Sequence, residues 1–192
     1  MIFKNSYPTA LLLWGACTFQ LVIVLGMIVY ALVPLINGKS IVLPIQATDP
    51  RDLMRGNYVA LQYSFSTISS KDIPNDLDSK KEYKYGDILW LTVKREGEVF
   101  KPSGIYTHKP DSGIYVKVIV NNSYLLQDST GNKTLFLDLK AGIEEYYTTQ
   151  VRAKLLETQI QKGDSFQALA FVKVAPSGNA RLEKIEIRKI KK

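Results

Sequence analysis

An uninterrupted run of apolar residues near the N-terminus constrains this chain more than any other feature. The run extends over Leu11–Leu35 and contains no charged side chain. As an α-helix it would be about 37 Å long, which exceeds the hydrocarbon core of a bilayer, about 30 Å. A secretory signal peptide has a shorter apolar region, about 7–15 residues. The sequence therefore predicts an uncleaved transmembrane anchor over residues 11–36 and a folded domain over residues 40–192.

The flanks of the apolar run bear on its orientation. Residues 1–10 form a short lead, which we expect to be cytoplasmic. Positive charges are nearly balanced, with Lys4 before the run and Lys39 after it, so the charge rule does not choose an orientation. A short N-terminal flank followed by a large domain fits an N-in anchor with the domain on the extracytoplasmic side.

Small residues recur on one face of the predicted anchor. Gly15, Thr18, Val22 and Gly26 follow 3-4-4 spacing, which aligns them along one stripe of a helix. Such a stripe lets a second transmembrane helix approach closely, so it predicts a docking face. The alternative interpretation is that the small residues are incidental and the polar Gln20 bonds within its own helix.

Charge and composition exclude several classes of function. The chain carries 25 Lys and Arg against 18 Asp and Glu, a net charge of +7. These basic residues alternate with apolar ones and do not cluster with aromatics, so no nucleic-acid partner is expected. The single cysteine, Cys17, and the single histidine, His108, cannot build a zinc site within one chain. No phosphate-binding loop or dinucleotide fingerprint is present, and we predict neither metal nor cofactor.

Alternating apolar residues and turn signals predict a domain that is mainly β. Pro44 would restrict the first strand to an edge or a bulge. A polar segment, Ser66–Tyr85, is predicted to be an exposed loop, and Thr149–Ile160 a short helix. The fold class is a compact antiparallel β barrel or folded-over sheet with one short helix. The predicted strands are Ser40–Gln46, Asn57–Ser66, Ile88–Arg95, Val99–Thr107, Gly113–Val120, Lys133–Leu139, Ser165–Ala175 and Ala180–Ile187.

A glycine followed by Asn or Asp precedes three of the β-rich runs. Glycine adopts turn conformations that other residues resist, and Asn or Asp can bond nearby backbone groups. The pattern therefore predicts three strands that begin in the same way. It occurs at Arg55-Gly56-Asn57-Tyr58, Tyr85-Gly86-Asp87-Ile88 and Lys162-Gly163-Asp164-Ser165.

Side chains suited to catalysis are sparse in the predicted domain. His108 lies in a turn, and no Gly-x-Ser-x-Gly elbow supports a Ser-His-Asp triad. Glu144 and Glu145 are neighbours, so on a strand they point to opposite faces and do not form an acid–base pair. The charged segment Asp49-Pro50-Arg51-Asp52 is interpreted as a turn held by Asx bonding and local ion pairs.

Membrane-anchored signal peptidases offer one enzymatic parallel, because they also combine an N-terminal anchor with a β-rich domain. Leu53–Val59 resembles the Gly-Asp-x-Val strand that follows their catalytic Ser-Met. Leu53 occupies the position before Met54 where the nucleophile would stand, and acyl transfer needs an activated nucleophile beside a base. A hydrolase with a pocket near this segment stays open as an alternative function.

Two segments carry a resemblance to a known family. Gly56, Tyr58, Leu61 and Tyr63 match a Gly-Asp-Tyr-x-x-Leu-x-Tyr motif, with Asn57 in place of the aspartate. The chain thus resembles the GDYXXLXY family of membrane-anchored bacterial proteins. The preceding Asp49-Pro50-Arg51 and the later Gly142-Ile143-Glu144 with Tyr146 also look like that family's segments. The resemblance implies a single-pass protein of the bacterial cytoplasmic membrane, with an extracytoplasmic β-rich domain and no established activity.

These observations lead to one preferred function and two alternatives. The preferred hypothesis is a non-enzymatic subunit that binds a polytopic membrane protein, with Asp49, Arg51, Arg55, Tyr58 and Tyr63 shaping its recognition surface. The alternatives are the membrane-anchored hydrolase and a cell-envelope module that binds a ligand or lipid inside its β domain.

Overall fold

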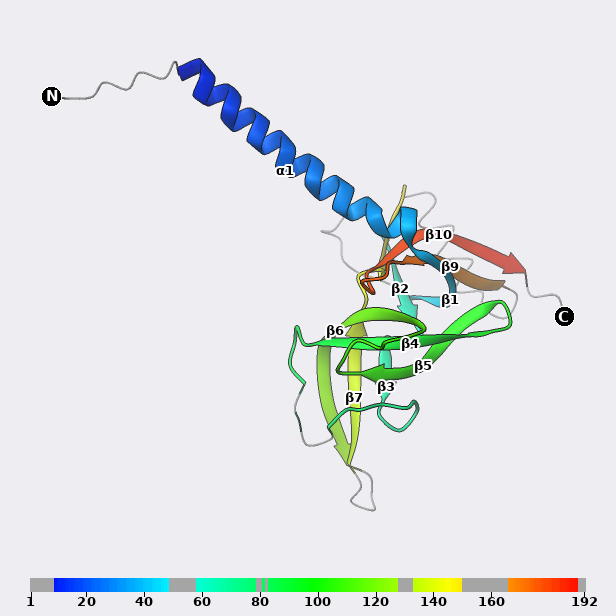
Figure 1. Ribbon diagram of the computed structural model, residues 1–192. Helices are drawn as coiled ribbons and strands as arrows, with labels where there is room; N and C mark the ends of the chain where they lie inside the picture. The colour runs from blue at the N-terminus through cyan, green and yellow to red at the C-terminus, as the bar shows by residue number, and fades with distance from the viewer. Residues whose placement is uncertain are drawn as a thin grey trace.

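The computed structural model describes residues 9–48, 58–78, 81, 83–127, 133–149 and 166–189. One long helix precedes a domain built from strands, and the helix projects away from that domain (Figure 1). The elements are α1 (Thr9–Asn37), β1 (Lys39–Thr48), β2 (Tyr58–Tyr63), β3 (Thr67–Ser69), β4 (Ile88–Glu96), β5 (Val99–Tyr106), β6 (Ile114–Gln127), β7 (Lys133–Lys140), β8 (Glu145–Tyr147), β9 (Phe166–Val174) and β10 (Ala180–Lys189).

The strands form two antiparallel sheets of five strands each. The first sheet has the order β10-β9-β1-β2-β8, and the second has the order β3-β7-β6-β4-β5. Buried side chains from both sheets belong to one hydrophobic cluster, so the two sheets share a core. The prediction of a mainly β, antiparallel, folded-over architecture after an apolar N-terminal helix is therefore confirmed.

The alternation of apolar residues explains which face of each strand is buried. Successive side chains of a strand point to opposite faces, and in each central strand every second residue is apolar. Each fully buried aliphatic side chain contributes about 1.5–3 kcal/mol of transfer free energy. The inward-facing residues include Ile41, Leu43 and Ile45 of β1, Leu89, Leu91 and Val93 of β4, and Val116, Val118 and Val120 of β6.

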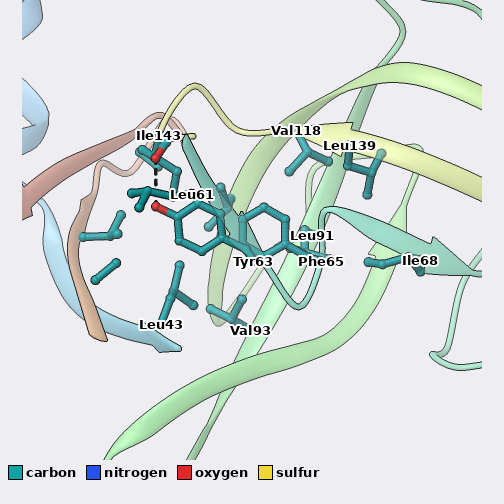
Figure 2. Close-up of a cluster of buried hydrophobic side chains, with 14 of the residues drawn as sticks. Leu43, Leu61, Tyr63, Phe65, Ile68, Leu91, Val93, Val118, Leu139 and Ile143 are labelled. Carbon is teal, nitrogen blue, oxygen red and sulfur yellow. Dashed lines mark hydrogen bonds between the residues drawn. The ribbon is translucent and has the colours of Figure 1, made fainter. Parts of the chain in front are cut away.

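The chain crosses from the first sheet to the second between β2 and β3. Phe65 lies at this corner, is fully buried, and stacks on the ring of Tyr63 with centroids 5.0 Å apart and an interplanar angle of 7° (Figure 2). Ser66 fixes the corner, because its hydroxyl oxygen accepts a hydrogen bond from the backbone N–H of Tyr63 at 3.0 Å. The backbone carbonyl of Ser66 also accepts from the N–H of Leu139, at 2.8 Å, in the second sheet.

Strand β1 is the central strand of the first sheet, although it contains a proline. Pro44 pairs in register with Leu169 of β9, whereas pairing with β2 begins one residue later, at Ile45. The prediction that Pro44 would restrict this strand to an edge or a bulge is therefore wrong, because β1 is central and its pairing shows no register shift. Within the described residues, Pro44 has a neighbouring strand only on the side of β9. Its missing N–H therefore does not interrupt the hydrogen bonds between β1 and β2.

The segment Ser66–Tyr85 differs from the exposed loop that its polar composition predicts. It contains β3, which pairs with β7, and its side chains Ile68 and Tyr83 are buried. Asn75 forms an isolated bridge with Ile105. The few apolar residues here are widely spaced, so no strand period marks them, yet they cover one end of the core.

Local turn predictions fare better than the loop prediction. Gly86 has φ of +96°, and the Asp87 carboxylate accepts a hydrogen bond from the N–H of Lys84 at 3.0 Å. This agrees with the proposed role of the Gly-Asp pair before β4. Both hairpins, β4–β5 and β9–β10, also form as predicted. The other two Gly-Asn/Asp pairs and all but the first residue of the predicted helix Thr149–Ile160 lie outside the described residues.

Candidate functional site

The two segments that resemble family motifs lie side by side in the structure. Val59 pairs with Tyr146 in the register of β2 and β8. The N–H of Leu61 donates to the backbone carbonyl of Glu144 at 2.8 Å. The Tyr63 hydroxyl donates to the backbone carbonyl of Ile143, also at 2.8 Å (Figure 2). Three residues of β2 thus contact Ile143, Glu144 and Tyr146 of the later segment.

Tyr63 acts in this arrangement as a buried, neutral hydrogen-bond donor. Its side chain is 3% exposed. Burial, and secondarily the negative charge of Glu144, raise the pKa of the Tyr63 phenol above its ordinary value. A phenol that resists ionisation is unsuited to serve as a base at neutral pH. Tyr63 and the equally buried Leu61 therefore hold the fold together and are not accessible to a partner.

The carboxylate of Glu144 closes the turn between β7 and β8. One of its oxygens accepts a hydrogen bond from the N–H of Ala141, and the other accepts from the N–H of Gly142 at 2.9 Å. Gly142 has φ of +77°, a conformation that favours glycine. Both carboxylate oxygens are thus engaged by backbone donors. Tyr146 is half-buried and packs against the core.

Most of the predicted recognition surface falls outside the part of the chain that the structure describes. Tyr58 begins β2, where its backbone pairs with Tyr147. Three residues of this surface and three residues of the family motif beside them are not described, so their roles stay predictions. They are Asp49, Pro50, Arg51, Arg55, Gly56 and Asn57.

The predicted docking face of the helix is fully accessible. Gly15, Thr18, Val22 and Gly26 are all exposed. A Cβ added at Gly15 or Gly26 would meet no atom within 4 Å. The helix contacts the described domain only near its C-terminal end, against β9 and β10.

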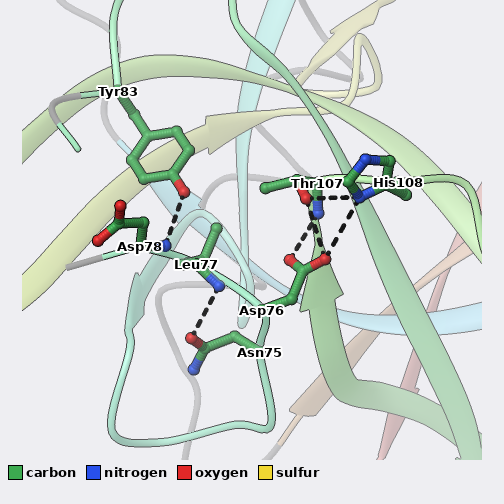
Figure 3. A network of polar contacts seen from close by, with 7 residues as sticks. All are labelled: Asn75, Asp76, Leu77, Asp78, Tyr83, Thr107 and His108. Atoms are coloured by element: carbon green, nitrogen blue, oxygen red, sulfur yellow. Dashed lines mark hydrogen bonds and ion pairs between the residues drawn. The ribbon is translucent and has the colours of Figure 1, made fainter. Parts of the chain in front are cut away.

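A cluster around His108 has the residue types of a catalytic triad but not the geometry. The N–H and hydroxyl of Thr107 donate to the two carboxylate oxygens of Asp76 at 2.7 and 2.9 Å (Figure 3). The Thr107 hydroxyl and the Asp76 carboxylate both approach the same ring nitrogen, Nδ1 of His108, at 2.8 and 3.7 Å. A triad instead uses the two ring nitrogens for different partners.

The same cluster has a structural role. Asp76 joins the segment before β4 to the end of β5, and the His108 side chain is 90% exposed. Sequence reasoning identified His108 as an exposed turn residue but missed Asp76 and Thr107, because nothing local in the sequence pairs them. In the described part of the chain, no three His, Cys, Asp or Glu residues lie close enough together to hold a metal ion.

Two adjoining cavities open beside the later family segment. One, of about 420 Å³, is lined by Ile143, Glu144, Glu145 and Tyr147. The other, of about 230 Å³, lies between the helix and both sheets. Lys140, Gly142 and Arg181 line both. Sequence reasoning missed these basic residues and Lys117 of the smaller cavity, since the three come from three separate strands.

A family model described as "GDYXXLXY protein" matches residues 20–185. The chain belongs to the GDYXXLXY family. The matched region begins within α1 and ends in β10, so it includes both motif segments and the residues that line the two cavities. No curated protein and no solved structure matches the chain. The GDYXXLXY match thus identifies the family and leaves the function to be argued from the site.

Proposed function

We propose that this GDYXXLXY protein is a membrane-anchored accessory subunit that binds a polytopic membrane protein through its helix and presents its β domain at the membrane surface. One observation carries the proposal. The helix is apolar and long enough to cross a bilayer, and its small-residue face meets no other part of the described chain. Close helix packing in membranes uses such faces.

The chemistry of the family segments supports a role in binding and not in catalysis. In the described part of these segments, the Tyr63 hydroxyl and both carboxylate oxygens of Glu144 are hydrogen-bonded to backbone groups. A general base must reach the proton it removes, and these groups are committed to the fold. The segments instead hold β8 and the turn before it, which lines the larger cavity, against β2.

Co-purification in mild detergent tests the proposal. The full chain should recover a defined multispanning partner. The double substitution Gly15→Leu and Gly26→Leu should abolish recovery, because two bulky side chains prevent close approach. The matched control, Cys17→Leu with Val24→Leu on the opposite face, should retain it. Recovery of the protein alone at every detergent and salt condition, or equal loss in the control, contradicts the proposal.

The proposed location is the cytoplasmic membrane of a bacterium, with the N-terminus inside and the β domain outside. The family resemblance supports this orientation. Protease added to spheroplasts should remove the β domain, whereas the same protease added to sealed inverted vesicles should leave it intact. The reverse pattern would establish the opposite topology.

An activity-based probe screen of the full chain in detergent tests the competing hydrolase function. We expect no labelling, because the Asp76–Thr107–His108 cluster lacks the geometry of a triad. Labelling of a Ser or Thr that disappears when that residue is changed to Ala would overturn the accessory role.

A further inference from the structure

The smaller cavity lies where the helix meets the β domain. We call it the helix-proximal groove, defined by Tyr30, Lys117, Ile119, Lys140, Asn179 and Arg181. The Tyr30 hydroxyl accepts a hydrogen bond from the Asn179 side chain at 3.5 Å. Tyr30 stands about 10 Å before the end of α1, at a rise of about 1.5 Å per residue. In a helix that crosses a hydrocarbon core of about 30 Å, this position is near the boundary between the acyl chains and the headgroups, where tyrosine is enriched.

The groove is built by a contact between the two sheets. The turn between β9 and β10 sits against β6, where the N–H of Lys117 donates to the carbonyl of Gly178 at 2.8 Å. The Tyr115 hydroxyl donates to the carbonyl of Pro176 at 2.7 Å. This contact sets Arg181, from the first sheet, beside Lys117, from the second.

Strand β7 supplies the third basic residue. Lys140 is the last residue of β7 and pairs in register with Ile119 of β6. Ile119 and Lys117 are two residues apart on one strand, so they share a face. The groove thus receives one basic side chain from each of three strands, at positions that the backbone fixes.

The charge of the groove is not neutralised by its own walls. None of the residues that line this cavity carries a carboxylate. Among the described residues, Lys117, Lys140 and Arg181 take part in no ion pair. Glu144, in the adjoining cavity, has both oxygens on backbone N–H groups.

The side of the groove toward the helix is apolar. Ile119 is 43% exposed and Tyr30 is 70% exposed. An anionic group held by the three basic residues would therefore have hydrocarbon surface next to it, continuous with the apolar helix. An anionic phospholipid is complementary to such a groove, because its negative headgroup lies next to its apolar acyl chains.

We propose that the helix-proximal groove binds the phosphate-bearing headgroup of an anionic phospholipid. Lys117, Lys140 and Arg181 contact the phosphate and its neighbouring oxygens, while Ile119 and Tyr30 contact the start of the acyl chains. The proposal rests on the membrane insertion of α1 that the proposed function also assumes, but not on a protein partner.

Lipid titration of the full chain in mild nonionic detergent tests this site. Native mass spectrometry or intrinsic fluorescence would measure binding of dioctanoyl phosphatidylglycerol and of dioctanoyl phosphatidylcholine. We expect preferential binding of the anionic lipid. The triple substitution Lys117→Gln, Lys140→Gln and Arg181→Gln should weaken that binding by about 100-fold, from the typical contribution of one basic residue at an anionic membrane surface.

A charge-matched control removes three basic residues outside the groove. The triple substitution Lys71→Gln, Lys94→Gln and Lys133→Gln lowers the net charge equally, and these side chains are exposed. Its lipid affinity should stay within about twofold of the parent, because its substitutions leave the groove intact. If the groove triple variant fails to fold, the single variants Lys140→Gln and Arg181→Gln take its place. Each should lower the affinity for the anionic lipid about fivefold.

Three outcomes would overturn the proposal. The first is equal affinity for the two lipids, and the second is an equal loss of lipid affinity in the control variant. The third is binding of glycerol 3-phosphate as tight as that of the anionic lipid, which would assign the groove to a soluble phosphate compound. Equal affinity of the parent chain for the two lipids, with partner recovery intact, would overturn this inference alone. Extraction of the chain from membranes by alkaline carbonate would overturn the proposed function as well.

Discussion

The hydroxyl of Tyr63 donates to the backbone carbonyl of Ile143, 2.8 Å away, although 80 positions separate the two residues in the chain. Ile143 is itself buried, with 1% of its surface exposed. The bond joins β2 to the turn before β8. It explains why a tyrosine, and not a phenylalanine, ends the strand that gives the family its motif.

Replacing this tyrosine tests the value of the bond. Tyr63→Phe keeps the ring and its stacking on Phe65 but leaves the buried carbonyl of Ile143 without its donor, at a cost of about 2 kcal/mol in the free energy of unfolding. Urea denaturation of the full chain in detergent measures the change. Tyr85→Phe, at a tyrosine that is 81% exposed, should change stability by less than about 0.5 kcal/mol. An equal loss in both variants would contradict the assignment.

The raised pKa of Tyr63 makes stability fall in alkali. Above about pH 10 an unfolded tyrosine loses its proton, whereas folded Tyr63 keeps it because burial raises its pKa. The native state then binds more protons, so this group lowers stability by at most about 1.4 kcal/mol per pH unit. The stability difference between the parent and Tyr63→Phe should be constant below pH 9 and shrink from pH 10 to 11. A difference that is constant across this range would refute the pKa shift.

The Glu144 carboxylate stabilises the turn before β8 through its two backbone donors. Glu144→Ala removes both hydrogen bonds and should cost about 2 kcal/mol, while Glu144→Gln retains one acceptor oxygen and should cost about 1 kcal/mol. Chemical denaturation gives the ranking. Glu183→Ala, at an exposed glutamate, serves as the control. Equal stability of the Ala and Gln variants would show that the hydrogen bond retained by glutamine contributes nothing.

Gly178 should tolerate substitution less well than Gly97. Both have positive φ, +81° and +64°. A Cβ at Gly178 would lie 2.7 Å from the Trp90 ring and 3.1 Å from the N atom of Lys117, whereas one at Gly97 would meet open space. We expect Gly97→Ala to cost about 1 kcal/mol and Gly178→Ala about 3 kcal/mol. Thermal unfolding followed by tryptophan fluorescence measures both, and equal costs would exclude the predicted clash.

Features set by neighbouring residues were predictable from the sequence. The β4–β5 and β9–β10 hairpins follow from alternating apolar residues around a glycine-containing turn, and α1 follows from the apolar run. These elements need only short-range information. The prediction also identified both family segments, although their contact through Tyr63 and Ile143 depends on which distant strands pair.

Long-range pairing explains what the sequence left undetermined. No local signal places β1 between β9 and β2, because Pro44 by itself favours an edge strand. In the structure the pairing of β1 with β2 starts at Ile45, one residue after the proline. No period marks Ile68 or Tyr83 as buried. Lys117, Lys140 and Arg181 converge only because the β9–β10 turn docks on β6. Alternation assigns a side chain to a face, but not to a neighbour on another sheet.

The junction between helix and domain has a mechanical consequence. α1 ends at Asn37 and β1 begins at Lys39, so one glycine separates the helix from the middle strand of a sheet. A long linker would let the domain rotate freely relative to the helix, whereas a one-residue connection restricts that rotation. A helix longer than the local bilayer thickness tilts to match it. In the proposed membrane-anchored state, bilayer thickness should therefore influence the angle between the β domain and the membrane surface.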